Sequence, residues 1–244
     1  AAAGTALIIV EHAFVHPQGR HSSTQIGVHD DACVDGLSRL AAAVHAEGAV
    51  ACLQISHAGA RASSRVTGLP VVAPSPVATS RESNPDAPAE LTQAQVAEVI
   101  EAFAAAAWRA RAAGFDAVEF HAAHGFLLSQ FLSPLTNSRT DEYGGDHARR
   151  SRIHLEVLEA IRHRAGKDFP VFVRLGMHDE RPGGLTLAPA CITAAQLAAA
   201  GASLIDVSGG LAGSEDPGRG AGYFVGYAEA LKEEALAIVL ATAE

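Results

Sequence analysis

Two histidines, three residues apart, follow a short apolar run near the middle of the chain. Residues 117–120 predict a buried strand, and His121 and His124 come directly after it. Two neutral imidazole N–H groups aimed at one carbonyl oxygen can stabilise the negative charge that develops there when hydride adds at the β-carbon. The spacing lets both rings converge if the chain turns helically after the strand. The pair is therefore a candidate oxyanion site.

Two other roles are open for this pair. Both histidines could be structural, each satisfied by hydrogen bonds in the core, and the residues taken alone favour this more common role. They could also be metal ligands, but a metal site requires a third ligand, and neither an HExxH motif nor a Cys/His set accompanies the pair. We therefore predict no metal site.

A second candidate is an arginine inside another apolar run. Residues 171–175 predict a buried strand, and Arg174 lies almost at its end. A buried guanidinium is costly unless it meets an anion or strong hydrogen-bond acceptors. Arg174 is therefore expected either in an internal salt bridge or beside a bound anionic group.

The elements that must position these residues alternate regularly along the chain. Short runs, mostly β-branched or aromatic, predict buried strands at 6–10, 49–55, 117–120, 171–175, 204–207 and 237–240. Longer segments predict helices at 32–47, 92–113, 146–165, 188–200 and 223–234. Four of these helices end at a glycine in the position of a helix C-terminal cap: Gly48, Gly114, Gly166 and Gly201.

This β-α alternation suits either a doubly wound sheet or a barrel. No GxGxxG motif follows the first strand, and the candidate residues lie at the carboxyl ends of several strands, which favours an α/β fold of the (β/α)8 TIM-barrel class. Since a closed barrel has eight strands, we expect about six of them here, about strands 2–7. One βα unit would precede Ala6 and at least one would follow Leu240, so residues 1–244 form one incomplete barrel domain.

Composition narrows the function classes. Hydrophobic residues make up 48% of the chain and the formal net charge is −9, so there is no basic surplus for nucleic acid or an anionic membrane surface. No apolar run approaches the roughly 20 residues that span a bilayer. The three cysteines, Cys33, Cys52 and Cys191, form no CxxC pair and are expected to be reduced. We expect a cytoplasmic enzyme with a small-molecule substrate.

The longest irregular stretch covers residues 56–90 and contains five prolines, which disfavour a helix. It could be a flexible linker. The apolar residues Val71, Val72 and Ala73 at its centre instead favour packing onto the barrel mouth.

The segment from Asp116 to Gly145, DAVEFHAAHGFLLSQFLSPLTNSRTDEYGG, resembles the signature segment of Old Yellow Enzyme-like proteins, in the branch with a His-x-x-His pair. The resemblance implies an FMN-dependent TIM-barrel enzyme that uses NADH or NADPH, and it gives His121 and His124 the role of binding the substrate carbonyl. It also implies a homo-oligomer. Asn137, Arg139 and Asp141 are expected to hold a structural turn.

Three further segments carry the resemblance. In IIVEHAFVHPQGR, the backbone at His12 is implied to touch the flavin, and in ACLQISHAGAR, Gln54 is implied to pair with the pyrimidine edge of the ring. A glutamine that only bonds barrel backbone is the alternative. In VFVRLGMHDERPGG, Arg174 is implied to face the anionic reduced flavin, and the glycines of LIDVSGGL are implied to let flavin or substrate approach the backbone. His57 and Arg61 are expected near the barrel mouth.

One residue departs from the family pattern. Tyrosine commonly follows HxxHG there and protonates the α-carbon, whereas this chain has Phe126, a substrate-site residue that cannot donate a proton. The leading hypothesis is an ene-reductase that passes hydride from NAD(P)H through FMN to an activated C=C bond. The alternatives are other flavin chemistry of the family, such as N-demethylation or dienoyl reduction, and an incomplete remnant without flavin.

Overall fold

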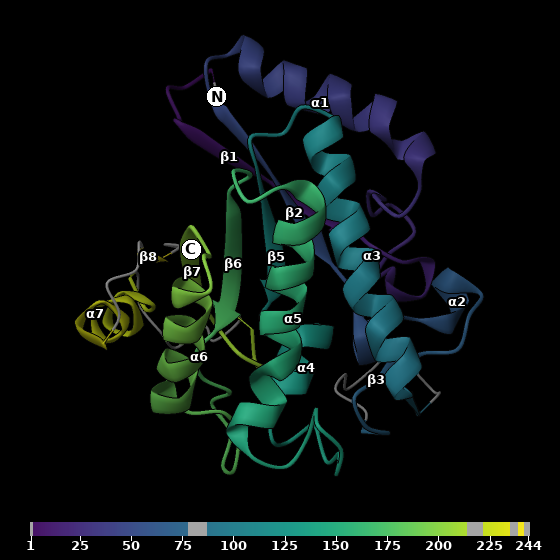
Figure 1. Cartoon of the computed structure of the whole chain (residues 1–244), viewed down its shortest axis with the longest axis vertical. Coiled ribbons are helices and arrows are strands. Elements are labelled where there is room, and N and C mark those ends of the chain that lie inside the picture. Colours follow the sequence, from purple (N-terminus) through teal and green to yellow (C-terminus); the bar gives the residue numbers. More distant parts are fainter. Residues whose placement is uncertain (1, 78–86, 214–221, 235–238, 242–244) are drawn as a thin grey trace.

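The computed structural model describes residues 2–77, 87–213, 222–234 and 239–241, and its centre is a parallel sheet (Figure 1). The strands follow one another in the order β1-β2-β5-β6-β7-β8, with every neighbouring pair parallel. They are β1 (Leu7–Phe14), β2 (Val50–Ser56), β5 (Ala117–Ala122), β6 (Val171–Gly176), β7 (Leu204–Ser208) and β8 (Val239–Ala241).

A helix connects each strand to the next one in the sheet. These helices are α1 (Val34–Ala46), α3 (Gln93–Ala112), α5 (His147–Ala165), α6 (Leu187–Ala199) and α7 (Val225–Glu234). Helices α3, α5 and α6 lie side by side over one face of the sheet (Figure 1). Successive parallel strands joined by helices on a common face form the repeating unit of a barrel wall.

Local sequence explains where the helices begin and end. Thr92 and Gln95 form a reciprocal capping box at the start of α3, and the Asp146 side chain accepts a hydrogen bond from the Arg149 backbone at the start of α5. Gly114 and Gly166 follow the ends of these helices with φ values of 91° and 100°, which favour glycine. The predicted ends of both helices are therefore correct to within a residue or two.

The middle strands carry much of the core. All six residues of β5 are buried, and the largest fully buried side chains include Phe103 from α3 and Phe120 from β5. The predicted strands are confirmed in place and direction, except that residues 237 and 238 of the last one lie outside the described residues. The prediction of an α/β fold with parallel strands is confirmed.

Several short elements were not predicted. They are the helices α2 (Ser64–Thr67) and α4 (Leu127–Leu132), the 3-10 turns Pro17–Gly19, Asp31–Cys33 and Gly59–Arg61, and the strands β3 (Val72–Ala73) and β4 (Ala89–Glu90). Strands β3 and β4 pair within the predicted long loop, and Val71, Val72 and Ala73 are buried. The prediction that this loop packs is confirmed for its described part.

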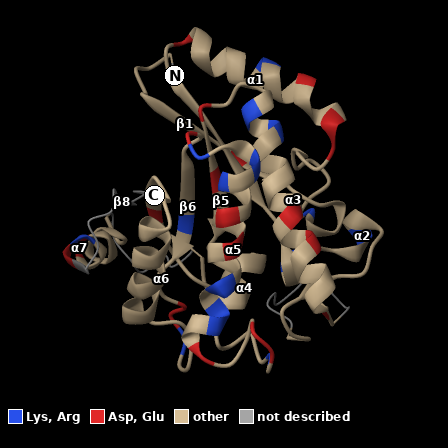
Figure 2. Cartoon of the chain, viewed as in Figure 1, with Lys and Arg blue, Asp and Glu red and all other residues tan. Residues whose placement is uncertain are grey.

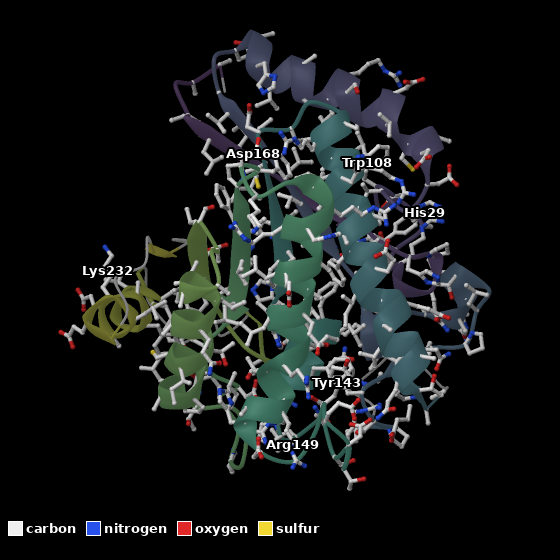
Figure 3. The ribbon with its side chains drawn as sticks, viewed as in Figure 1. His29, Trp108, Tyr143, Arg149, Asp168 and Lys232 are labelled. Carbon is white, nitrogen blue, oxygen red and sulfur yellow. The ribbon has the colours of Figure 1, made fainter. Side chains whose placement is uncertain are left out.

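The outer helices carry charges of both signs. In Figure 2, basic and acidic residues are interspersed along α3 and α5. Trp108, labelled in Figure 3, lies on α3 and is partly exposed. Within the described residues, no helix combines the length and apolar character needed to cross a bilayer. Among the described residues, Cys33, Cys52 and Cys191 form no disulfide bond.

Candidate active site

A polar cavity opens among the side chains of five neighbouring strands, β1, β2, β5, β6 and β7. Its volume is about 460 Å³. It is lined by Ile9, Glu11, His12, Gln54, Glu119, His121, His124, Phe126, Arg174 and Asp206. The cavity therefore contains every site residue that the sequence predicts: His12, Gln54, His121, His124, Phe126 and Arg174.

His121 and His124 lie together at the end of β5. Their ring centroids are 5.0 Å apart and the ring planes are nearly perpendicular. The sequence spacing lets the rings converge if the chain turns helically, but they converge through a different turn. The backbone leaves the strand and passes through His124 with φ = 56°, a conformation that residues other than glycine rarely adopt. The His124 amide donates to the Gly209 carbonyl at 3.1 Å, so the loop after β7 supports this turn.

Burial keeps both imidazoles neutral. It lowers the pKa of His121 well below its ordinary value, with nearby His124 acting in the same direction, and it lowers the pKa of His124 to about 3, helped by Arg174 and Arg61. Neutral imidazole carries one N–H group and one acceptor nitrogen. The hydrogen-bond partners of each ring therefore decide which nitrogen faces the cavity as a donor.

The partners assign different donor nitrogens to the two rings. The Ala123 amide donates to Nδ1 of His121 at 3.2 Å, which places the hydrogen of His121 on Nε2. Nη2 of Arg174 donates to Oγ of Ser208 at 3.3 Å, and this oxygen lies 2.6 Å from Nε2 of His124. Since the Ser208 oxygen accepts from Arg174, its hydroxyl hydrogen is available to donate to Nε2 of His124. The hydrogen of the neutral His124 ring is then on Nδ1.

His12 enters the cavity through an irregularity in β1. Val10 pairs with Leu53 and Ala13 pairs with Ile55, so two residues of β1 stand opposite the single residue Gln54. Such a bulge turns side chains and backbone out of the regular ladder and is common beside active sites. Burial lowers the pKa of His12 to about 4. The sequence predicts contact through the backbone here, and the structure adds the imidazole.

Gln25 fixes the His12 ring. Its Nε2 donates to Nδ1 of His12 at 2.8 Å and to the His12 carbonyl at 3.0 Å, and Oγ of Ser56 lies 2.9 Å from the same Nδ1. The neutral ring therefore carries its hydrogen on Nε2.

Gln54 and Glu119 occupy paired positions on β2 and β5. Nε2 of Gln54 donates to Oε1 of Glu119 at 2.7 Å, and Oε2 of Glu119 is buried without a hydrogen-bond partner among the described residues. Burial and the nearby Asp206 carboxylate raise the pKa of Glu119 to about 7, against the opposing effects of Gln54 and Arg174. Gln54 therefore forms a hydrogen bond with a side chain, and the alternative that it bonds only barrel backbone is wrong.

Arg174 and Asp206 are paired in register on β6 and β7. Nε of Arg174 lies 3.3 Å from Oδ2 of Asp206, whose side chain is almost fully buried. The internal salt bridge that the sequence leaves open is therefore present. Arg174 also lines the cavity and pairs in register with His121 on β5, so an ion pair with Asp206 and contact with a ligand are compatible.

Phe126 packs against the histidines. Its ring stacks on His121 with a centroid distance of 4.7 Å, and the rings of His12 and His21 approach its edge at 4.9 Å and 5.5 Å. The Arg61 guanidinium lies over the ring and donates to the His124 carbonyl. Arg61 is therefore at the mouth, as predicted.

His57 lies directly after β2 and does not reach the surface. It is fully buried, its pKa is lowered by burial to about 3, and its Nδ1 accepts from the Gly59 amide. The Pro17–Gly19 turn covers its ring closely at Gly19, so His57 packs beneath this turn directly after the carboxyl end of β2.

The rest of the signature segment is structural, as predicted. Asn137 donates to the carbonyls of Phe131 and Tyr143, both at 2.7 Å, and buried Arg139 donates to Asp141 and to the Pro74 carbonyl. Tyr143, labelled in Figure 3 near the start of α5, donates to Glu156 on that helix at 2.9 Å. This network ties the long loop to the barrel wall.

Close packing around the loop after β7 requires glycine at Gly209 and Gly210. A Cβ atom on Gly210 would lie 2.4 Å from the Asp179 carboxylate, and one on Gly209 would lie 2.1 Å from the Gly213 carbonyl. Buried Asp179 also accepts from the amides of Leu185 and Leu211. Close packing between the loops after β6 and β7 therefore requires glycine, whatever approaches from the cavity.

The sequence reasoning missed three residues of the site. Glu119, Asp206 and Ser208 lie in the same strands as predicted residues or immediately beside them, and each contacts a predicted residue. Glu119 precedes His121 by two positions, so strand alternation puts both on one face. The two-residue spacing from His121 could therefore have identified Glu119 as a residue of the site.

Comparison with known families identifies the chain. Residues 1–212 match the model of the NADH:flavin oxidoreductase / NADH oxidase family. The chain is 41% identical over 229 residues to the NADPH dehydrogenase of Bacillus velezensis, covering 94% of this chain and 66% of that protein. It is 44% identical over 208 residues to the metal reductase of Desulforamulus reducens, covering 85% of this chain and 30% of that protein. The chain thus spans about two thirds or less of these relatives.

Solved structures agree with the sequence relatives. A 2-naphthoyl-CoA reductase superposes with a TM-score of 0.91 at 28% identity, over 98% of this chain and 39% of that one. Morphinone reductase superposes with a TM-score of 0.83 at 30% identity, over 96% of this chain and 66% of that one. These likenesses confirm the predicted barrel class over part of its length, and the chain belongs to the NADH:flavin oxidoreductase family that includes the Old Yellow Enzymes.

Proposed function

We propose that this chain carries the catalytic cavity of an FMN-dependent oxidoreductase that reduces a C=C bond conjugated to a carbonyl group. The observation that carries the proposal is the convergence of His121 and His124 on one cavity as neutral rings with opposite tautomers. Nε2–H of His121 and Nδ1–H of His124 then supply two donors for one oxygen. A paired donor set of this kind is what an enolate oxygen requires.

The cavity residues fit the flavin ring. A buried carboxyl oxygen of Glu119 has no partner among the described residues, and Gln54 and Arg174 line the same cavity. The carboxamide of Gln54 offers the donor or acceptor that the imide edge of the ring requires, and Arg174 offers positive charge. The bulge at His12 leaves backbone groups outside the regular ladder for a further contact.

When bound, FMN would accept hydride from NADH or NADPH and deliver it to the substrate's β-carbon. His121 and His124 would hold the carbonyl oxygen and stabilise the charge that it gains. A proton must then reach the α-carbon, so that NAD(P)H and one proton together saturate the C=C bond. Phe126 lines the cavity and cannot supply this proton, so water or another group must supply it.

A second candidate function follows from Phe126. A reaction that removes hydride from an amine, as in N-demethylation, needs no proton donor at that position. Dienoyl reduction is the other alternative within the family. The His121 and His124 donors favour a carbonyl substrate, because an amine offers no oxyanion to stabilise.

Two measurements test the proposal. The purified chain is titrated with FMN while flavin fluorescence is followed, and the loaded protein is assayed anaerobically with NADH or NADPH against a cyclic enone and against an N-methyl amine. Saturable FMN binding and enone-dependent oxidation of the nicotinamide are expected. Amine-dependent reduction of the flavin without enone turnover would favour the second candidate, and no FMN binding would contradict both.

A further inference from the structure

Four polar side chains on four consecutive strands of the sheet line the cavity. Gln54 and Glu119 are directly paired between β2 and β5, and Arg174 and Asp206 are directly paired between β6 and β7. Of these four residues, the proposed function gives a contact with the flavin ring only to Gln54 and Arg174. The two carboxylates are buried, where a charge is costly unless it has a partner.

The ion pair of Arg174 and Asp206 accounts for one positive and one negative charge. Ionising Glu119 would add a second carboxylate to the same buried space, close to Asp206. This explains why the pKa of Glu119 is raised to about 7. The hydrogen bond that Oε1 of Glu119 accepts from Gln54 is compatible with either protonation state, because a proton on Oε2 leaves Oε1 an acceptor.

The role of Glu119 follows from its hydrogen bond with Gln54. The carboxamide has one donating end and one accepting end, and the 2.7 Å hydrogen bond commits Nε2 to Oε1 of Glu119. The other end, Oε1 of Gln54, is then the end available to a ligand in the cavity. An accepting oxygen is complementary to an imide N–H group, the donor at N3 of the isoalloxazine ring.

We infer that Glu119 is a positioning residue that fixes the carboxamide of Gln54 with its oxygen toward the cavity, so that the site selects a ligand with an imide N–H. This inference rests on the proposed function, because it takes the flavin ring as the ligand. It goes beyond that function by assigning ligand selectivity to a residue that need not touch the ligand.

The test compares FMN with its N3-methyl derivative, which lacks the imide hydrogen. Dissociation constants for both are measured by flavin fluorescence on the parent chain and on the variants Glu119→Leu and Glu119→Gln. Both ligands carry the same ribityl phosphate, so contacts to the phosphate cancel in the ratio of the two constants. The methyl group adds the same bulk in every protein.

The parent is expected to prefer FMN by at least about tenfold, the value of one well-formed hydrogen bond. In Glu119→Leu the carboxamide is free to turn, and the preference is expected to fall by about tenfold. Glutamine at position 119 can either donate or accept, so Glu119→Gln should lower the preference by roughly threefold while keeping the packing. If Glu119→Leu does not fold, the comparison of Glu119→Gln with the parent still tests the inference.

The exposed variant Glu98→Gln on α3 serves as the control and should leave the preference unchanged. An unchanged preference in both Glu119 variants, in proteins that still bind FMN, would overturn the inference and leave the proposed function standing. A parent chain that binds neither ligand would overturn both. A general loss of affinity with an unchanged ratio would mean that Glu119 is only structural, which also overturns the inference.

Discussion

Nε2 of His124 lies 2.6 Å from the hydroxyl oxygen of Ser208, although the two residues are 84 positions apart in the chain. This contact determines which nitrogen of His124 can donate into the cavity. Ser208→Ala removes it and lets the ring adopt either tautomer. We expect enone reduction by the preloaded, reduced protein to slow by about tenfold, because one hydrogen bond that orients a donor is lost.

The measurement is the rate of flavin reoxidation by an enone under anaerobic mixing. Reduction of the flavin by NADPH serves as the internal control and should change less than about twofold, since His124 acts on the substrate carbonyl. Equal slowing of both half-reactions would contradict the orienting role of Ser208.

Arg174 and Asp206 are expected to shift the flavin reduction potential in opposite directions. Arg174→Met removes a positive charge beside the proposed ring site and should lower the potential and weaken FMN retention. Asp206→Asn keeps the arginine and removes the carboxylate that neutralises it, so the potential should rise. Potentials are measured by equilibration with reference dyes.

The double variant Arg174→Met/Asp206→Asn controls for stability. Arg174→Met alone leaves Asp206 buried without its ion-pair partner, which costs about 3–5 kcal/mol. The double variant removes both charges and should recover much of that stability, with a potential between those of the two single variants. If all three folded, flavin-bound variants keep the parent potential, Arg174 has only its structural role.

Glu119 should make the protein less stable as the pH rises. Its pKa is raised from 4.5 to about 7 in the folded state, so the folded protein holds this proton more tightly than the unfolded chain. The associated stability is present below about pH 4.5 and is lost as the pH rises through 7. The total loss in the free energy of unfolding is about 3 kcal/mol.

Glu119→Gln cannot lose this proton. The difference in unfolding free energy between Glu119→Gln and the parent should therefore grow in favour of the variant from pH 5 to pH 8, by up to about 3 kcal/mol. Chemical denaturation at the two pH values measures it. The buried histidines titrate in both proteins and cancel in the difference, and a difference independent of pH would contradict the raised pKa.

Phe126→Tyr places a hydroxyl in the cavity at the position where the family commonly has a proton donor. We expect it to speed enone reduction by about tenfold, at the low end of what a positioned general acid contributes. Phe14→Tyr adds the same group where the ring stacks on His29, away from the cavity lining, and should have no such effect. An unchanged rate in Phe126→Tyr would show that protonation does not limit the parent.

Much of the fold could be predicted because strands and helices both have clear sequence patterns in this chain. Apolar runs such as 171–175 are short and bounded by turn residues, and glycines such as Gly114 mark helix ends. The carboxyl ends of parallel strands meet at one end of a barrel, which places His121 and Arg174 together. His12 and Gln54 could be assigned to the same site through the family resemblance.

The remaining features depend on pairing and backbone geometry. The bulge opposite Gln54 requires the register of β1 against β2, and the turn at His124 requires a positive φ that its residue type does not suggest. Both faces of these strands are buried, so alternation does not reveal whether Asp206 faces the cavity or the helices. Contact of His124 with Ser208 likewise follows only from the folded chain.

The paired donors of His121 and His124 are the central claim, and single alanine variants test it most directly. Each variant is loaded with FMN, reduced with NADPH under anaerobic conditions and mixed with an enone. Both His121→Ala and His124→Ala should slow flavin reoxidation by roughly 10²–10³, while flavin reduction by NADPH changes far less. If both variants reoxidise with the enone at the parent rate, these histidines do not bind the substrate carbonyl.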